Sequence, residues 1–472
     1  MMNNRWTLHL ENFGKIEYAD VTVAPLTLFV GDNNSGKSYL MTLLYMLLRM
    51  SFHDLDICED LEEYENCADW LRKAIDNMLG GLRAYPFNGE TLSLFTALLN
   101  RILERNKENI SVQAFDRVVN IGEISISFQQ NMEGFLVVKD RNDNNRLSRF
   151  IYFANNEEEI SSNYDRADSF ICDVTDGDFS PDETSHAIAY ILEKMIGREY
   201  SSEMSTHTDV AFLPISRTGF LLTRAPLVGD AVSRVYTPAA YTLTNRRFSD
   251  VRLTKPCSDF LRTVATIDKR NGLEEDSPLI MSVIHFMETQ MIHGTIYVSN
   301  DLSMPAFSYH PDQMLEGDFP MFLSSGVVTE LAPLLLLLQY TPVRTLFIEE
   351  PEMSLHPELQ QKMARVLIRL ANQKMLVFAT THSNTMIQHV NNMIKLSYLS
   401  EKTQAEIMAR FGFEPSDLIS EEDISMCQFD VQKNGRTMVS ELSGDESGFL
   451  VPTFRDALKN MLDQARATRQ EI

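Results

Sequence analysis

An octapeptide with two glycines, GDNNSGKS at 31–38, has the residue types and spacing of a phosphate-binding loop. It satisfies GxxxxGK[ST], a pattern in which backbone N–H groups of the loop and of the next helix bind phosphate oxygens. In this interpretation Lys37 neutralises the β and γ oxygens, and Ser38 offers its hydroxyl to Mg²⁺. An ordinary glycine turn is the alternative. The residues assigned to the nucleotide are Gly31, Asn33, Asn34, Ser35, Gly36, Lys37 and Ser38.

A second segment, TLFIEEPE at 345–352, is an apolar strand that ends in two carboxylates. The carboxyl end of such a strand lies at the ligand-binding edge of a parallel sheet. We therefore predict that Glu349 holds Mg²⁺, through water, and that Glu350 polarises the attacking water as a general base. A solvated strand end explains the pair equally well when it is taken alone.

A third segment, LVFATTHS at 376–383, is again an apolar strand with a polar tip. His382 stands one helix and one strand after the paired acids, where it could reach a γ-phosphate or the attacking water. A lone histidine is more often a satisfied surface or core residue. Its position after Glu350 favours the catalytic interpretation here.

A fourth segment, FLSSGVVTELAPLLLLLQ at 322–339, places small residues before an apolar helix. A helix N-terminus binds anions, so Ser324, Ser325 and Gly326 could bring hydroxyl and backbone donors to a γ-phosphate. That phosphate would not be the one bound at their own loop. A plain helix start capped by serine is the alternative.

The elements that must position these segments follow from periodicity. Residues 5 to 30 predict three short strands, and the segment after Ser38 predicts a helix that is apolar almost all round. Strands at 344–349 and 375–379 are separated by an amphipathic helix at 357–372. Alternating strands and helices predict an α/β fold with a mostly parallel sheet flanked by helices, together with antiparallel strands near the N-terminus.

The chain divides by composition into a split head, 1–52 with 208–400, and a mixed helical and β insertion at 53–207. We interpret the insertion as a lid or a partner-binding lobe. The segment 401–472 is predicted to complete the head with a hairpin and a helix. Smaller elements expected in these regions are helices at 55–79, 90–104, 184–196 and 452–470, strands at 124–128, 135–138 and 210–214, a mostly helical region up to 293, a polar loop DRNDNNR at 140–146, and a type I′ turn around Lys433-Asn434-Gly435.

Charge, cysteine content and the length of apolar runs limit the kinds of partner that the chain can have. With 42 Lys+Arg against 66 Asp+Glu, the formal charge of −24 disfavours strong sequence-independent DNA binding by the isolated chain. The acidic excess fits either a basic partner protein or a solubility role. Five scattered cysteines support neither a disulfide framework nor a zinc site, which fits a cytoplasmic location. The apolar run at 331–338 is too short to span a bilayer, so no membrane contact is expected.

The four segments occur in a recognisable order: GDNNSGKS, LSSG, FIEEPE followed by SLHPELQ, and TTHS. This order resembles the ABC-type P-loop ATPase heads of the RecF, SMC and overcoming-lysogenisation-defect group, over residues 5–50 and 210–400. The resemblance implies ATP with Mg²⁺ as cofactors and a homodimer or higher oligomer, in which Ser324–Gly326 of one copy completes the site of another. It also places the dimer-contact loop at 354–357 and makes Arg217 a candidate to face the lobe. LSSGVVTE differs from the transporter sequence LSGGQ, which argues against a transporter subunit.

Stand-alone bacterial ATPases of this group, including AAA-family ATPases, often serve antiphage defence, as in the PARIS, Septu, Gabija and retron-associated systems. The resemblance therefore implies an ATP-hydrolysing switch or sensor that controls an effector such as a nuclease. Only about 90 residues follow His382 and they contain no evident cluster of metal-binding acids, so the effector is expected to be a separate chain. The alternatives are a RecF-like DNA repair ATPase that binds DNA directly and a scaffold that binds ATP without hydrolysing it.

Overall fold

The computed structural model shows two compact units. One unit comprises Met1–Val23 with Leu43–Asp209, and the other comprises Ala24–Thr42 with Val210–Ile472. Each unit is treated by itself below. The described residues are 5–128, 134–143, 146–154, 170–173, 181–197, 209–223, 253–267, 278–299, 306–312 and 317–469.

The second unit is built on a sheet in which four strands run parallel in the order β15-β3-β14-β13, with β9 added parallel at one end and β16 antiparallel at the other. All six residues of β3 are buried, as expected for a central strand with both faces covered. The predicted mostly parallel sheet is therefore confirmed. The strands are β3 (Leu26–Gly31), β9 (Val210–Leu213), β13 (Thr345–Glu349), β14 (Leu376–Thr381), β15 (Ile424–Val431) and β16 (Thr437–Glu441).

Strand register in this sheet is marked by a row of aromatic side chains. Phe347 of β13 is paired with Phe378 of β14 and with Phe212 of β9. The Phe347 and Phe378 rings are stacked with centroids 4.3 Å apart, and those of Phe347 and Phe212 are 6.0 Å apart. Because one-residue slips would turn every side chain to the opposite face, this buried row helps to fix which residues reach the carboxyl ends of the strands.

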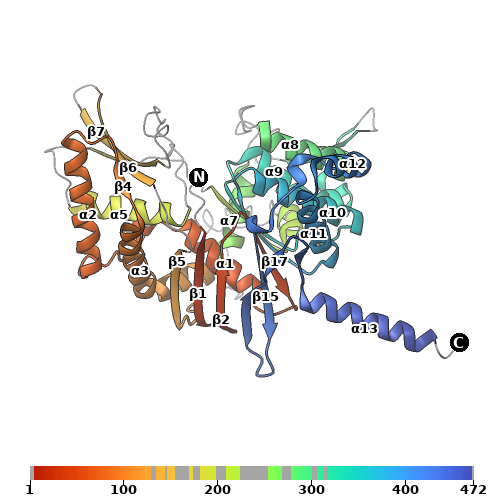
Figure 1. The fold of residues 1–472 in the computed structure, drawn as a ribbon. Helices are drawn as coiled ribbons and strands as arrows, with labels where there is room; N and C mark the ends of the chain where they lie inside the picture. The colour runs from red at the N-terminus through yellow and green to blue at the C-terminus, as the bar shows by residue number, and fades with distance from the viewer. Residues whose placement is uncertain are drawn as a thin grey trace, which may run out of the picture. The chain divides into compact units, whose positions relative to one another are not determined.

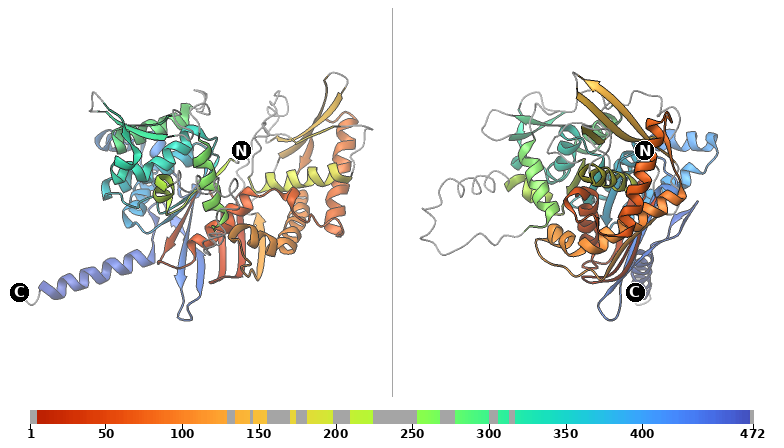
Figure 2. Two further views of the ribbon diagram at one scale, coloured as in Figure 1. Left: turned by 180° about the vertical axis from the view of Figure 1, so that it is seen from behind. Right: turned by 90° about the vertical axis from the view of Figure 1, so that its left-hand side faces the viewer.

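Most helices of the second unit pack together beside this sheet, whereas the last one, α13 (Pro452–Arg469), extends away from them (Figures 1 and 2). Leu331 to Leu338 of α9 are buried without interruption, and Pro333 lies inside the helix. Together with buried side chains of α8, α10 and α11 they form one hydrophobic core with β3, β13 and β14. The helices are α7 (Lys255–Thr266), α8 (Pro278–Met287), α9 (Gly326–Tyr340), α10 (Pro357–Asn372), α11 (Asn384–Ser397), α12 (Glu401–Phe411) and α13 (Pro452–Arg469).

The first unit contains two antiparallel sheets, β5-β1-β2 and β4-β6-β7-β8. The Trp6 indole N–H of β1 donates a hydrogen bond to the Ile196 carbonyl at 3.1 Å, so the end of α5 is tied to this strand. The elements are β1 (Trp6–Phe13), β2 (Ile16–Thr22), α2 (Glu62–Leu79), β4 (Tyr85–Phe87), α3 (Gly89–Phe115), β5 (Glu123–Phe128), β6 (Gly134–Asp143), β7 (Arg146–Ala154), β8 (Phe170–Asp173) and α5 (Pro181–Met195). The predicted N-terminal antiparallel strands and mixed insertion elements are present.

Several local expectations need correction. The polar stretch 140–146 is not a loop over its length, because β6 and β7 extend into it as a paired hairpin. The hairpin at 433–435 exists, yet its turn is not type I′, since only Gly435 of this turn has a positive φ, of 79°. Gln432 N–H instead donates to the Arg436 carbonyl at 2.7 Å, which leaves three loop residues with glycine in the left-handed position.

Other elements were not expected at all. A three-stranded antiparallel sheet, β10-β11-β12, lies after the region predicted to be mostly helical, where no element was predicted, and helix α12 precedes the final hairpin. Its strands are β10 (Gly294–Ser299), β11 (Ala306–Pro311) and β12 (Phe319–Pro320). Helix α3 also runs to Phe115, well beyond the predicted end at 104.

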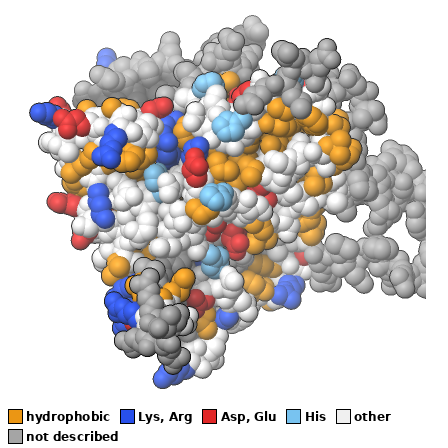
Figure 3. All heavy atoms as spheres, turned by 90° about the vertical axis from the view of Figure 1, so that its right-hand side faces the viewer, with side chains coloured by type: hydrophobic (Ala, Val, Ile, Leu, Met, Phe, Trp, Pro, Cys, Tyr) orange, Lys and Arg blue, Asp and Glu red, His pale blue; other side chains and the backbone are white. Residues whose placement is uncertain are grey.

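Side-chain character is mixed on the surface. On the face shown in Figure 3, the described Lys and Arg side chains are scattered among acidic and hydrophobic ones and form no continuous basic stripe.

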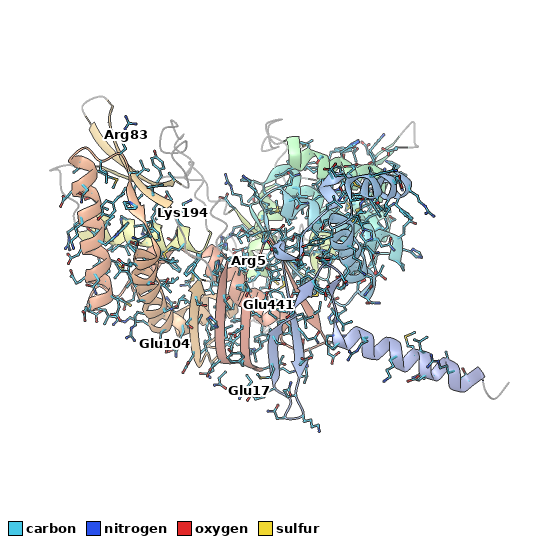
Figure 4. The ribbon with its side chains drawn as sticks, viewed as in Figure 1. Arg5, Glu17, Arg83, Glu104, Lys194 and Glu441 are labelled. Carbon is cyan, nitrogen blue, oxygen red and sulfur yellow. The ribbon has the colours of Figure 1, made fainter. Side chains whose placement is uncertain are left out.

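Glu441 at the end of β16, labelled in Figure 4, accepts a hydrogen bond from the Ser425 hydroxyl of β15 at 3.1 Å. In the described part of the chain no helix is long and apolar enough to cross a membrane.

Candidate active site

The phosphate loop follows β3 and ends at helix α1 (Lys37–Arg49), as its sequence pattern predicts. Gly31 has a φ of 134°, and a Cβ there would lie 2.5 Å from the Phe429 carbonyl oxygen of β15. Both facts require glycine at this position. Asn34 and Gly36 also have positive φ angles, of 58° and 106°. The loop therefore turns sharply and directs the first N–H groups of α1 toward its own concave side.

Lys37 lies inside this loop with only 6% of its surface exposed. Its ammonium donates to the carbonyl oxygens of Gly31 at 3.0 Å and Asp32 at 2.7 Å, and to Ser35 Oγ at 3.3 Å. Burial lowers the pKa of Lys37 to about 8, although the negative charges of Glu350, Asp32 and Glu352 act in the opposite direction. A buried cation held by its own loop can be transferred to phosphate oxygens without leaving the site.

The acid pair stands at the end of β13, beside the loop's strand across β14. The pairings Glu349 with Thr380 and Thr381 with Val30 bring the carboxyl ends of β13, β14 and β3 to one edge of the sheet. Glu349 is 7% exposed, and its Oε2 accepts a hydrogen bond from the Ile215 N–H at 3.1 Å. Glu350 lies further out, with 29% of its side chain exposed. The two neighbouring acids thus occupy different environments.

Glu350 has an unusual backbone conformation, with a φ of 42°. A non-glycine residue in this region costs on the order of 1–3 kcal/mol, and such strain persists only where the surroundings enforce it. Here the Glu350 N–H donates to Thr380, reaching Oγ1 at 3.0 Å and the carbonyl oxygen at 3.1 Å. The end of strand β14 therefore holds the Glu350 backbone in this conformation.

His382 directly follows β14, at the same edge of the sheet as Glu350. Its Nε2 lies 3.6 Å from Glu350 Oε1, and 28% of its side chain is exposed. Burial, followed by the positive charge of Lys37, lowers the pKa of the imidazole. A neutral imidazole at pH 7 can accept a proton or donate a hydrogen bond beside a carboxylate. The structure therefore places three of the predicted groups, Lys37, Glu350 and His382, within electrostatic reach of one another.

Glu352 is a member of this site that the sequence analysis did not single out. Its Oε1 accepts hydrogen bonds from the His382 N–H at 2.6 Å and from Thr381 Oγ1 at 2.8 Å. Burial raises its pKa, against the effect of these hydrogen bonds. Among the described residues Oε2 has no hydrogen-bond partner. The signal in the sequence was a third acid in the same EEPE run, two positions after Glu350.

The predicted anion-binding end of α9 is exposed. Ser325 and Gly326 are both exposed, and the Ser325 hydroxyl caps the helix by accepting from the Val328 N–H at 3.4 Å. The Ser324 hydroxyl donates to the Pro320 carbonyl at 3.5 Å. Phe322 and Leu323, just before them, are 73% and 64% exposed. The serine cap agrees with the plain interpretation of this segment, and the exposure leaves its donors accessible.

Arg217, the predicted lobe-facing candidate, is buried at the ends of the strands. It is 2% exposed, and its guanidinium donates to the carbonyl oxygens of Glu349 at 2.6 Å and Glu350 at 3.1 Å. It also forms an ion pair with Glu330 of α9. The reason is its position directly after β9, where the chain turns over the end of β13. Arg217 therefore belongs to the interior of the site.

The residues present fit a nucleotide-borne Mg²⁺. Mg²⁺ retains waters and phosphate oxygens and needs only one or two protein ligands, typically carboxylates. Ser38 at the start of α1 and Glu349 at the end of β13 supply a hydroxyl and a carboxylate of the required hardness. In the part of the chain that the structure describes, no group of three or more His, Cys, Asp or Glu residues could hold a metal unaided. Such an ion would thus depend on the nucleotide for its other ligands.

Comparison with known proteins agrees with this geometry. A family model for the AAA ATPase domain matches residues 7–208 and 337–387, more than half of the chain. The chain belongs to the AAA ATPase domain family. The matched ranges of this ATPase domain include Gly31–Ser38, the acid pair and His382, whereas Arg217 and Ser324–Gly326 lie outside them. No curated protein matches the sequence.

Several solved SMC heads are similar to this AAA ATPase domain. One is the Smc head bound to the C-winged helix domain of ScpA, with 11% identity, a TM-score of 0.36, and coverage of 93% of this chain and 97% of that one. A second is an Smc head with an extended coiled coil bound to the C-terminal domain of ScpA, derived from Pyrococcus furiosus. It shares 10% identity with a TM-score of 0.36, and the similarity covers 98% of this chain and 98% of that one. The SMC head domain from Thermotoga maritima shares 10% identity with a TM-score of 0.33, and the similarity covers 94% of this chain and 100% of that one.

Proposed function

We propose that the chain binds Mg²⁺ and ATP at the loop Gly31–Ser38 and hydrolyses the γ-phosphate bond. The observation that carries this proposal is the strand register, which brings the loop, His382 and the acid pair to one edge of the sheet. In the proposed arrangement Asn33 to Ser38 surround the phosphates with N–H groups, and Lys37 neutralises their charge. Membership in the AAA ATPase domain family supports the same assignment.

The proposed chemistry divides the two acids by environment. Glu349, buried and held by the Ile215 N–H, orients the water shell of Mg²⁺, which when bound polarises the phosphate oxygens. Glu350 is exposed enough to meet a water and accepts its proton as that water attacks the γ-phosphorus. His382, 3.6 Å from Glu350, is placed to donate to the transferred phosphoryl group or to the water. The products are ADP and inorganic phosphate.

We further propose that the site is completed by a second copy of the chain. The segment Ser324–Gly326, of which Ser325 and Gly326 are exposed, would bring its hydroxyls and N–H groups to the γ-phosphate held by the other copy's loop. The exposed apolar side chains of Phe322 and Leu323 next to it support an intermolecular contact there. Ser354 and His356, exposed at the predicted dimer-contact loop, fit the same face of the proposal.

At the biological level we propose a nucleotide-dependent switch that controls a separate effector protein, as in bacterial antiphage systems. This part rests on the resemblance of the motif order described above. The insertion 53–207 is proposed as the lobe that contacts a partner, and 401–472 as an extension of the head. The net charge of −24 disfavours direct DNA binding by the isolated chain.

The proposed binding site is tested with Lys37→Ala. The variant loses the buried ammonium that the loop holds by three hydrogen bonds, so we expect Mg·ATP affinity to fall at least about 100-fold, roughly the weight of a strong charge-assisted contact pair. Isothermal titration with a non-hydrolysable ATP analogue gives the affinity. Lys402→Ala, an exposed lysine on α12, is the control and should bind normally. Unchanged affinity of Lys37→Ala would refute the site.

A further inference from the structure

Arg217 joins three parts of the second unit that are far apart in sequence. Its guanidinium donates to the Glu349 carbonyl at 2.6 Å and to the Glu350 carbonyl at 3.1 Å. These two carbonyls belong to the peptide groups on either side of the Glu350 Cα. Because the orientation of both peptide planes sets the direction of the Cα–Cβ bond between them, Arg217 helps to fix the direction in which the Glu350 side chain leaves the backbone.

The other side of the same guanidinium faces α9. Arg217 forms an ion pair with Glu330, and both side chains are almost fully buried, at 2% and 5% exposed. The Thr218 hydroxyl donates to Glu330 Oε2 at 2.6 Å, so the carboxylate is held in a defined orientation. Glu330 stands four residues after Gly326, about one helical turn from the exposed end of α9. A shift of that end would be passed to Arg217 through a rigid turn of helix.

We propose that Arg217 is a positioning residue that couples the anion-binding end of α9 to the direction of the Glu350 carboxylate. The inference rests on the proposed function, and deepens it: an anion bound at Ser324–Gly326 would align Glu350 through Glu330 and Arg217. Hydrolysis would then be fast only when the second copy's nucleotide is in place. Arg217 and Glu330 both lie outside the ranges matched by the AAA ATPase domain family, 7–208 and 337–387.

A matched control exists in the same unit. Arg369 is also a buried arginine, 3% exposed, and it pairs with a buried carboxylate, Asp417, at 2.7 Å. It contacts no residue of the candidate site by any hydrogen bond or ion pair described for it. Arg217→Met and Arg369→Met therefore remove the same charge from similarly buried pairs, and only the first touches the carbonyls of the acid pair.

The test compares turnover and ATP affinity in the wild type, Arg217→Met, Arg217→Lys and Arg369→Met, with Glu350→Gln as the inactive reference. We expect kcat to fall about 100-fold in both Arg217 variants with ATP affinity within about threefold of the wild type, since a small misalignment of a reacting group has this effect. Lysine keeps the positive charge but cannot donate to both carbonyls from a planar group, so we expect Arg217→Lys not to restore kcat. Arg369→Met should lose thermal stability to a similar extent and keep its kcat.

A second readout does not depend on turnover or on Arg217 variants folding. ATP analogue binding to the wild type should slow hydrogen exchange at the first turns of α9 and at the turn that begins with Glu350. Glu330→Gln should leave the α9 response in place and weaken the response at Glu350, while ATP still binds. If the wild type hydrolyses ATP, Glu350→Gln does not, and Arg217→Met matches Arg369→Met, the coupling is wrong and the proposed function stands. If Glu350→Gln turns over normally, the proposed function is wrong; a response at the Glu350 turn that Glu330→Gln leaves intact contradicts the coupling in either case.

Discussion

Two clusters in the second unit both pair a buried arginine with a carboxylate, and they differ in whether a carboxylate is left partly exposed and its backbone strained. At the strand ends, Arg217 supports an acid pair of which Glu350 is 29% exposed and strained at a φ of 42°. In the second cluster, Asp417 is fully buried and receives hydrogen bonds from Arg365 at 2.8 Å and Arg369 at 2.7 Å.

The Asp417 cluster has the features of a structural site. Burial alone would raise the pKa of Asp417, but the hydrogen bonds from Arg369 and Arg365 keep it below its ordinary value, so the carboxylate stays charged. Both arginines also lie against the Phe286 ring, at 4.7 and 4.1 Å from its centroid. The comparison teaches that buried charge marks a candidate site only when exposed carboxylate, strained backbone and an available cation accompany it.

The largest effect that we expect is on the free energy of unfolding when the Asp417 cluster is disrupted. Asp417→Ala would leave Arg365 and Arg369 buried without their shared carboxylate, which typically costs about 3–5 kcal/mol of unfolding free energy. Chemical denaturation measures the loss. In the part of the population that remains folded, kcat and ATP affinity should match the wild type. A folded Asp417→Ala protein with a large loss of kcat would show that the two clusters do not differ as described.

Glu352 offers a smaller effect on the catalytic side. Glu352→Ala removes the acceptor of the His382 N–H and of the Thr381 hydroxyl, so the imidazole loses its backbone anchor. We expect kcat to fall about 10- to 100-fold, as for displaced catalytic groups in general, with little change in ATP affinity. Glu358→Ala, an exposed acid in the same segment, is the control. Equal kcat values for the two variants would remove Glu352 from the site.

The pH dependence of ATP binding gives the smallest effect. The pKa of Lys37 is lowered by burial to about 8, so the free site loses its cation above that pH, and ATP binding must then take up a proton. Affinity should be constant up to about pH 7 and about tenfold weaker at pH 9, since each unit above the pKa costs a factor of ten. Titration calorimetry in buffers of different ionisation enthalpy detects the proton uptake.

The effect of the Lys37 pKa on the free energy of unfolding does not account for this loss of ATP affinity. The unfolded chain binds more protons than the folded one between pH 8 and the ordinary lysine range, so this group's contribution to the unfolding free energy rises with pH in that window. An affinity that stays flat from pH 7 to pH 9 would contradict the buried, neutralised state of Lys37.

The local patterns in the sequence were sufficient for most of the sheet and for the site's backbone. The helices at 326–340 and 357–372 and the strands at 345–349 and 376–381 lie where their periodicity predicted them. Each is long or continuously apolar, so burial and local propensity indicate the same state. Because parallel strands end at a common edge, the proximity of Glu350 and His382 also followed from the order of elements.

The rest depended on contacts that no local pattern encodes. Arg217 meets Glu330 and Glu349 more than 100 residues away, and its burial follows from where β9 joins the sheet. Glu352 became visible only through its hydrogen bond to the His382 N–H. The turn at Gly435 differs from the predicted type because the strands β15 and β16 pair around three loop residues. The predicted domain boundaries and partners remain predictions.

The measurement that tests the central claim most directly is phosphate release from Mg·ATP by the purified wild type and by Glu350→Gln, with analogue binding measured on both. The account predicts that the variant binds ATP as the wild type does and that its turnover falls about 10²- to 10⁴-fold, the usual contribution of a general base. A variant that releases phosphate at the wild-type rate would contradict the assignment of the strand-end carboxylate as the base.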